Sequence, residues 1–217
     1  MKSEIARRRN DPRDISVLRK SERTRQNILD TAMKFLWSNS FRDLKVASLT
    51  QRAGISRPCF YQYFADLHDL MENLLQVLEE EIISVAQPWF GAETDPVLKL
   101  YEALSGFVKV CYERGPLMRA VVEAAPMDER LEKAWNDVVN VFDNAVTLRI
   151  EQDQEAGLSP GFDARLVAIA LNRMDIGTVI YHFGSRPRSK MEPVYQSIVR
   201  IWISTIYGQE MLKQFEQ

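Results

Sequence analysis

Hydrophobic residues recur every three to four positions along most of this chain. Between 21 and 39 they fall on one helical face, formed by Ile28, Leu29, Ala32, Phe35 and Leu36. Further helical patterns are expected at about 46–53, 57–63, 66–87, 95–113, 116–125, 128–155, 163–183 and 191–215. No stretch alternates convincingly with period two. The pattern therefore predicts an all-α protein.

Proline and glycine interrupt the pattern. Pro88 to Pro96 is expected to be a break, and so is Gly115-Pro116. Residues 1–20 have little apolar periodicity, contain a proline and are rich in arginine, so they are expected to form a mobile basic arm. The expected organisation is this arm, a three-helix head at 21–66 and a larger helical body at 67–217.

The stretch from Val46 to Phe64, VASLTQRAGISRPCFYQYF, predicts a helix-turn-helix. Gly54 supplies a left-handed residue that ends the first short helix and turns the chain. Ser56 is a typical N-cap of the next helix, and Pro58 falls in its first turn, where a missing N–H costs nothing. Phe60 and Phe64, four residues apart, are expected to face the core.

The remaining side chains of the second helix are expected to face outward: Arg57, Cys59, Tyr61, Gln62 and Tyr63. Arginine can contact phosphate or guanine, glutamine can pair with an adenine edge, and tyrosine can reach phosphate oxygens or thymine methyl groups. For any one of them an ordinary surface role is an equal alternative. Their combination behind a glycine turn favours contact with double-stranded DNA.

Charge divides the chain in the same way. Residues 1–68 hold 14 Lys and Arg against 7 Asp and Glu, a net charge of +7, and the remainder holds 14 against 23, a net charge of −9. A basic first third is consistent with a polyanionic partner for that part alone, although a solvated charged tail would give the same imbalance.

The body is rich in large apolar side chains, and its segment 165–183 is apolar on nearly every face yet contains Asn172 and Asp175. These polar groups either find partners within a filled core or give an apolar cavity its anchoring contacts. The last two helices are apolar on more than one side, which indicates a second subunit and hence a homodimer.

Several stretches of the chain resemble a known family. GISRPCFYQYF, preceded by LTQRA and ILDTAMKFL, resembles the DNA-binding head of tetracycline-repressor-type (TetR) regulators over residues 23–75. ALNRMDIGT (170–178) and IVRIWISTIYGQE (198–210) resemble the ethionamide-resistance repressor branch. The resemblance implies a cytoplasmic homodimeric transcriptional regulator, by default a repressor, that binds a palindromic operator and is released by a small hydrophobic effector.

The resemblance also implies roles for particular residues. It places operator contacts at Lys45, Val46, Ala47, Arg57, Pro58, Cys59, Tyr61, Gln62 and Tyr63. It places Phe142, Asn172, Asp175 and Trp202 on the wall of a ligand tunnel, and the neighbouring apolar residues Phe107, Trp135 and Val139 are expected to complete that site.

Three positions depart from the family pattern. Lys45 stands where a capping Ser or Thr is usual, Leu67 where a phosphate-binding Lys is frequent, and Asp175 where the resembling branch has asparagine. A neutral Asp175 would suit an amide, ketone or ester ligand. An ionised one would prefer a cation or pair with Arg173. The arginines of the arm, Arg7, Arg8, Arg9 and Arg13, are expected to supplement the operator contacts.

Other classes are disfavoured. No apolar run reaches the roughly 18 residues of a membrane span, and no secretory signal is expected. Cys59 and Cys111 are far apart, and there are only two histidines, so neither a metal site nor a cofactor is expected. No catalytic motif and no catalytic residue is recognised. The alternatives are a non-specific nucleoid-type DNA-binding protein and, less favoured, a small helical enzyme.

Overall fold

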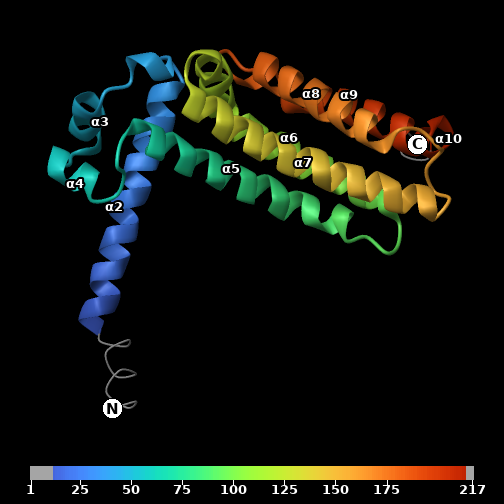
Figure 1. Ribbon diagram of the computed structural model, residues 1–217, viewed down its shortest axis with the longest axis horizontal. Helices are drawn as coiled ribbons and strands as arrows, with labels where there is room; N and C mark the ends of the chain where they lie inside the picture. Colours follow the sequence, from blue (N-terminus) through green and yellow to red (C-terminus); the bar gives the residue numbers. More distant parts are fainter. Residues whose placement is uncertain (1–11, 214–217) are drawn as a thin grey trace.

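The computed structural model describes the backbone of residues 12–213 and the side chains of 20–211. The described part is helical and contains no strand, as the hydrophobic pattern predicts (Figure 1). The head consists of α2 (Pro12–Leu36), the short 3-10 helix η1 (Phe41–Asp43), α3 (Val46–Ala53) and α4 (Arg57–Tyr61), gathered at one end of the molecule.

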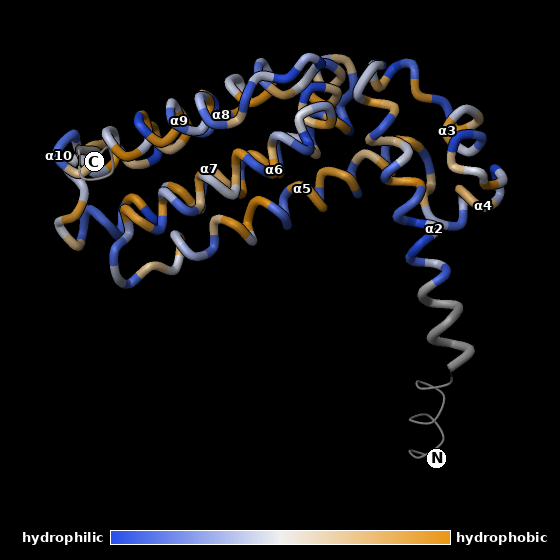
Figure 2. Tube along the Cα trace, turned by 180° about the vertical axis from the view of Figure 1, so that it is seen from behind, coloured by the Kyte–Doolittle hydropathy of each residue, from blue (hydrophilic) through white to orange (hydrophobic). Residues whose placement is uncertain are grey.

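The body is a bundle of longer helices. It consists of α5 (Leu67–Phe90), α6 (Pro96–Ala124), η2 (Ala125–Met127), α7 (Glu129–Glu155), α8 (Ala164–Phe183), α9 (Met191–Ile206) and α10 (Gln209–Lys213). Helix α5 leaves the head and runs the length of the body, whereas α8 and α9 lie along the opposite side of the bundle (Figure 1). Hydrophobic residues follow α5, α6 and α7 along their length (Figure 2).

The last part of the basic arm expected at 1–20 is helical. Helix α2 begins at Pro12, so residues 12–20, expected to be mobile, are helical. Proline in the first turn of a helix loses no hydrogen bond, so Pro12 marks a helix start rather than an irregular segment. Residues 1–11 lie outside the described residues.

The expected break at Gly115-Pro116 is wrong, because α6 runs through both residues. A proline inside a helix leaves the carbonyl four residues earlier without its N–H donor. Here that carbonyl belongs to Tyr112, and the Arg188 guanidinium donates to it at 2.8 Å. Arg188 also lies over the Tyr112 ring, 3.7 Å from its centroid. The lost backbone bond is therefore replaced from the loop between α8 and α9.

Two other helix ends differ from the expected ones. Helix α5 continues through Pro88 to Phe90, so the break before α6 is confined to 91–95. The last expected helix, 191–215, is two helices, because α9 ends at Ile206 and Gly208 turns the chain with a φ of 91° before α10.

Candidate DNA-binding and ligand-binding sites

The turn between α3 and α4 has the expected geometry. Gly54 ends α3 in the left-handed region, with φ 68° and ψ 32°. The Ile55 backbone N–H donates to the Thr50 carbonyl at 3.0 Å, and the Ser56 hydroxyl accepts from the Cys59 N–H at 3.3 Å. The Asn27 side chain of α2 donates to the Ala53 carbonyl at 2.8 Å, which fixes the end of α3 against the first helix.

Buried side chains hold α4 in place. Phe60 and Phe64 are fully buried as expected, with ring centroids 5.7 Å apart, and Leu49 of α3 is buried beside them. The Arg25 guanidinium lies 5.7 Å from the centre of the Phe64 ring. A short helix of five residues is thereby fixed by the core of the head rather than by its own hydrogen bonds.

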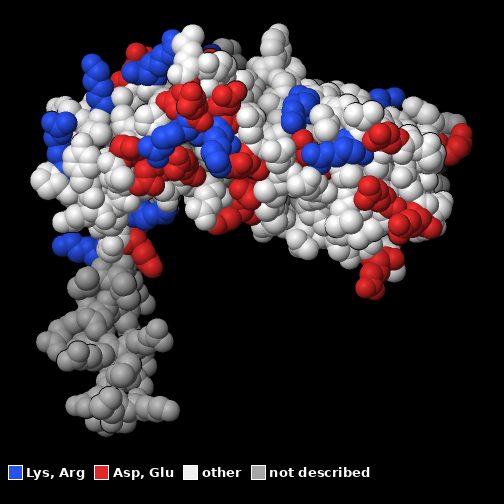
Figure 3. Space-filling view, viewed as in Figure 1, with Lys and Arg blue, Asp and Glu red and all other residues white. Residues whose placement is uncertain are grey.

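The outward face of the head carries most of the expected DNA contacts. The exposed ones are Lys45, Ala47, Arg57, Pro58, Tyr61 and Gln62. Val46, Cys59 and Tyr63 are half-buried. The expectation that Tyr63 faces fully outward is wrong in part, because α4 ends at Tyr61 and the following turn packs the Tyr63 ring against the core. Lys and Arg side chains mark the outer edge of the head (Figure 3).

Lys45 and Leu67 are the two positions in and next to the head that depart from the family pattern. The Lys45 side chain makes no capping bond to α3; instead the Ser48 hydroxyl donates to the Lys45 carbonyl at 2.9 Å. Leu67, at the start of α5, is half-buried against the core. Arg7, Arg8 and Arg9 lie outside the described residues and the side chain of Arg13 is not described, so a role for the arm stays a prediction.

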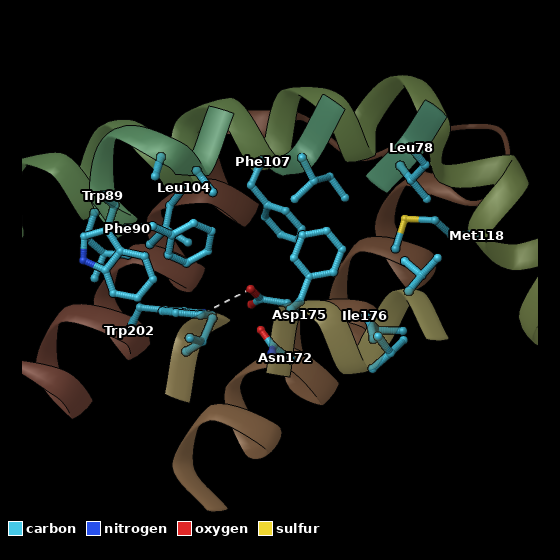
Figure 4. A pocket seen from close by; sticks show the side chains of 18 of the residues that line it. Leu78, Trp89, Phe90, Leu104, Phe107, Met118, Asn172, Asp175, Ile176 and Trp202 are labelled. Atoms are coloured by element: carbon cyan, nitrogen blue, oxygen red, sulfur yellow. Dashed lines mark hydrogen bonds between the residues drawn. The ribbon is translucent and has the colours of Figure 1, made fainter. Parts of the chain in front are cut away.

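A cavity of about 80 Å³ lies inside the body (Figure 4). The seven residues expected at a ligand site all line it: Phe107, Trp135, Val139, Phe142, Asn172, Asp175 and Trp202. They come from α6, α7, α8 and α9, so the fold brings together side chains that are nearly one hundred positions apart in the sequence. Their arrangement suits a mostly apolar molecule with one polar end.

Sequence reasoning missed the contribution of α5. Leu78, Ile82, Ala86, Trp89 and Phe90 supply one wall of the cavity. The first three are spaced four residues apart, which is a recognisable signal, but the same stripe is typical of any helix that packs on a core. The helix that leaves the head, α5, therefore also lines the cavity.

Trp89 is held rigidly at the end of the cavity away from the head. Its indole N–H donates to the Tyr207 hydroxyl at 3.0 Å, and that hydroxyl donates to Asp153 at 2.6 Å. Asp153 in turn pairs with Arg149 at 2.6 Å, and both side chains are almost completely buried. This network joins the last turn of α5 to α7 and to the end of α9.

The two polar lining residues have different surroundings. The Asn172 amide donates to the Asp143 carboxylate at 2.8 Å. Arg173 pairs with the same carboxylate at 3.0 Å. The alternative in which Arg173 pairs with Asp175 is therefore wrong, because Arg173 is directed at α7.

Asp175 is buried and only half satisfied. Its Oδ2 accepts from the Trp202 indole N–H at 3.0 Å, whereas Oδ1 has no hydrogen-bond partner among the described residues. Burial raises the pKa of this carboxyl group to about 8, and the bond from Trp202 opposes that rise. The protonated, neutral form therefore predominates at pH 7.

Asp175 should make the protein less stable as pH rises. Its folded-state pKa lies above the unfolded value, so the unfolded chain loses its proton first and stability falls between about pH 4 and 8, by at most about 1.4 kcal/mol per pH unit. Asp175→Asn should flatten this slope. The melting temperature of the variant, relative to that of the parent, should therefore rise from pH 5 to pH 8. Thermal unfolding checks this. The exposed Asp137→Asn is the control, and parallel pH profiles for the Asp175 variant and the parent would contradict the assignment.

No described helix combines the length and the apolar character needed to cross a membrane. Among the described side chains, no three His, Cys, Asp or Glu residues are placed so that they could hold a metal ion together.

The exposed recognition helix, the helical body and its internal cavity define the class of helix-turn-helix transcriptional regulators with a separate body. The chain belongs to the TetR family. Residues 28–74 match the family model described as bacterial regulatory proteins of the tetR family, and residues 100–208 match the C-terminal domain of the transcriptional regulator EthR. The chain is therefore a TetR-family, EthR-like regulator.

Individual relatives are also EthR transcriptional regulators. The chain is 27% identical to the transcriptional regulator EthR of Mycolicibacterium smegmatis over 188 residues, which covers 83% of this chain and 85% of that protein. It is equally similar to EthR of Mycobacterium tuberculosis, over 84% of this chain and 86% of the relative.

Solved structures share the fold. A TetR-family regulator from Syntrophomonas wolfei superposes with a TM-score of 0.70 at 15% identity, covering 84% of this chain and 94% of that one. The fatty acid degradation regulator FadR from Bacillus halodurans superposes with a TM-score of 0.70 at 18% identity, covering 81% of this chain and 94% of that one.

Proposed function

We propose that this protein is a ligand-responsive repressor that binds a palindromic operator as a homodimer and releases it when a small, mostly apolar molecule occupies the body cavity. The observation that carries the proposal is the position of α5. It follows the recognition helix α4 after the short segment 62–66, and its second half forms a wall of the cavity. One rigid helix thus joins the two sites.

The size of the cavity supports a mechanical link. Pockets that hold drug-sized ligands measure about 300–1,000 Å³, whereas this one measures about 80 Å³. Because protein interiors are close-packed, a larger occupant has to push the surrounding helices apart. Any outward shift of α5 moves the segment that carries the head.

Contacts between the start of α5, next to the head, and α7 would transmit such a shift. Arg130 of α7 binds Asp66 and Glu72 at the start of α5, at 2.8 Å and 3.0 Å, and His68 contacts Asp128. These exposed pairs contribute little to stability singly, but together they fix the direction of α5 relative to α7. A ligand can change operator affinity only by its different affinities for the two arrangements.

The dimer is proposed from the exposed face of α8. Five residues spaced three or four positions apart are exposed on it: Leu166, Ala170, Arg173, Gly177 and Tyr181. Leu166 is 64% exposed and Tyr181 is 84% exposed. The small residues Ala170 and Gly177 between these large side chains allow a second helix to approach closely. Ile201 of α9 is a further exposed apolar side chain.

Gly177→Arg should convert the dimer to a monomer and lower operator affinity strongly, because one subunit reaches only one half-site. The fold should survive, since a side chain added at Gly177 meets no atom within 4 Å. Sedimentation velocity measures the change in mass. Gln152→Arg, which adds the same charge at an exposed position on α7, should remain dimeric. A dimeric Gly177→Arg protein would place the interface elsewhere.

The link between cavity and operator can be tested by thermodynamic reciprocity. Small apolar molecules that raise the melting temperature should lower the affinity for the operator, and saturating operator should lower the affinity for these molecules by the same factor. Calorimetry with and without DNA measures both. Molecules that stabilise the protein and leave operator affinity unchanged would remove the ligand-responsive part of the proposal and retain the DNA-binding part.

A further inference from the structure

Among the described residues of the body three Asp side chains are buried, and they differ in their partners. Asp143 is paired with Arg173, and Asp153 is paired with Arg149. Asp175 has no cationic partner among the described residues, and its Oδ1 receives no hydrogen bond from them. An ionised carboxylate buried without a partner is costly, so Asp175 is held as the neutral acid, and its ionised form would be stabilised by a cation from outside the chain.

The Asp175 side chain lines the cavity. In Figure 4 the Asp175 carboxyl group points into the space between helices, and the dashed line marks its bond from Trp202. The described lining residues include no Lys, Arg or His. The cavity itself can therefore supply neither a positive charge nor a competing ion pair.

The cavity that Asp175 lines is rich in aromatic rings. Six of them line the cavity: Trp89, Phe90, Phe107, Trp135, Phe142 and Trp202. The face of an aromatic ring is electrically negative and attracts cations, most strongly where water is excluded. An unpaired acid among aromatic side chains is thus suited to a positively charged group attached to a hydrocarbon.

We propose that the cavity selects an apolar cation, an alkylammonium compound whose ammonium group binds Asp175 and whose hydrocarbon chain lies among the aromatic side chains. The inference rests on the proposed ligand-binding function and adds the charge of the ligand to it. The net charge of −9 on residues 69–217 also favours cations over anions.

Binding of such a ligand should release a proton. The empty site holds Asp175 mainly as the neutral acid below about pH 8, and pairing with an ammonium group requires the carboxylate. The groups that face it are Cys111 of α6, Asn172 of α8 and Trp202 of α9, with Asp143 of α7 bonded to Asn172. Burial and the nearby Asp175 raise the pKa of the Cys111 thiol, so Cys111 stays neutral, and α5 contributes apolar side chains.

The test is isothermal titration calorimetry of the full-length protein with four eight-carbon probes: octylammonium, 1-octanol, 2-octanone and octanoate. At pH 8 octylammonium should bind at least tenfold more tightly than 1-octanol, and octanoate should bind most weakly. The affinity of octylammonium should fall up to tenfold per pH unit below pH 8. In buffers of different ionisation enthalpy, nearly one proton should be released per ligand at pH 7 and almost none at pH 9.

Asp175→Asn keeps the shape of the side chain and removes its charge. It should lose the preference for octylammonium, the pH dependence and the proton release, and should still bind 1-octanol. The proton count of the unsubstituted protein tests the inference even where this variant folds poorly.

The possible failures are distinguishable. Equal affinities for octylammonium and 1-octanol, or tightest binding of 2-octanone, would overturn the cation inference and leave the ligand-binding function in place. Binding of none of the four probes would count against the ligand cavity itself, and with it the ligand-responsive part of the proposed function.

Discussion

Replacing Gln62 by alanine should weaken binding to the specific operator at least tenfold, while affinity for unrelated DNA stays nearly unchanged. Gln62 is exposed and follows the last residue of α4, on the face that would enter the major groove. A bidentate contact from glutamine to adenine discriminates against the wrong base by about 1–3 kcal/mol, and a dimer loses it twice. Fluorescence anisotropy with operator and scrambled duplexes measures both affinities.

The matched control is Gln76→Ala, at an exposed position of α5 outside the head. It should bind both duplexes as the unsubstituted protein does. An equal loss of affinity for operator and scrambled DNA in the Gln62 variant would mean that this side chain contacts the backbone of the DNA rather than a base edge.

Gly115→Ala should destabilise the body by about 2 kcal/mol. A Cβ atom at Gly115 would lie 2.5 Å from the Phe183 carbonyl oxygen and 2.6 Å from its carbon, so backbone at the end of α8 has to move. The better helix propensity of alanine offsets only about 1 kcal/mol of a larger strain. Chemical denaturation should show a lower midpoint with an unchanged slope.

Gly161→Ala serves as the control for this prediction. A Cβ atom there meets nothing within 4 Å, and its stability should stay within about 0.5 kcal/mol of the parent. An unchanged midpoint for Gly115→Ala would show that α6 and α8 are not packed as closely as described.

The head was predictable from sequence because its determinants are local. A glycine in the left-handed region, a serine cap and two core phenylalanines lie within eleven residues, and each has one structural explanation. Tyr63 was misplaced because α4 is shorter than its pattern indicated, and the core of the head decides where a five-residue helix ends.

The body was less predictable because its determinants are distant in sequence. Gly115-Pro116 resembles a break, and only the approach of Phe183 and Arg188 from the other side of the bundle explains why α6 continues. The wall that α5 gives to the cavity was missed for the same reason. Asp175 was identified by its polarity within an apolar helix, but its unpaired oxygen depends on Trp202 and on where Arg173 points.

Selection of bound sequences from random DNA tests most directly whether the two heads of a dimer read two related half-sites. A sequence with dyad symmetry should be enriched, with half-site centres about 34–36 Å apart or at a multiple of that distance. Recovery of no consensus, with strongly salt-dependent binding to every sequence, would contradict this expectation and favour a non-specific DNA-binding protein.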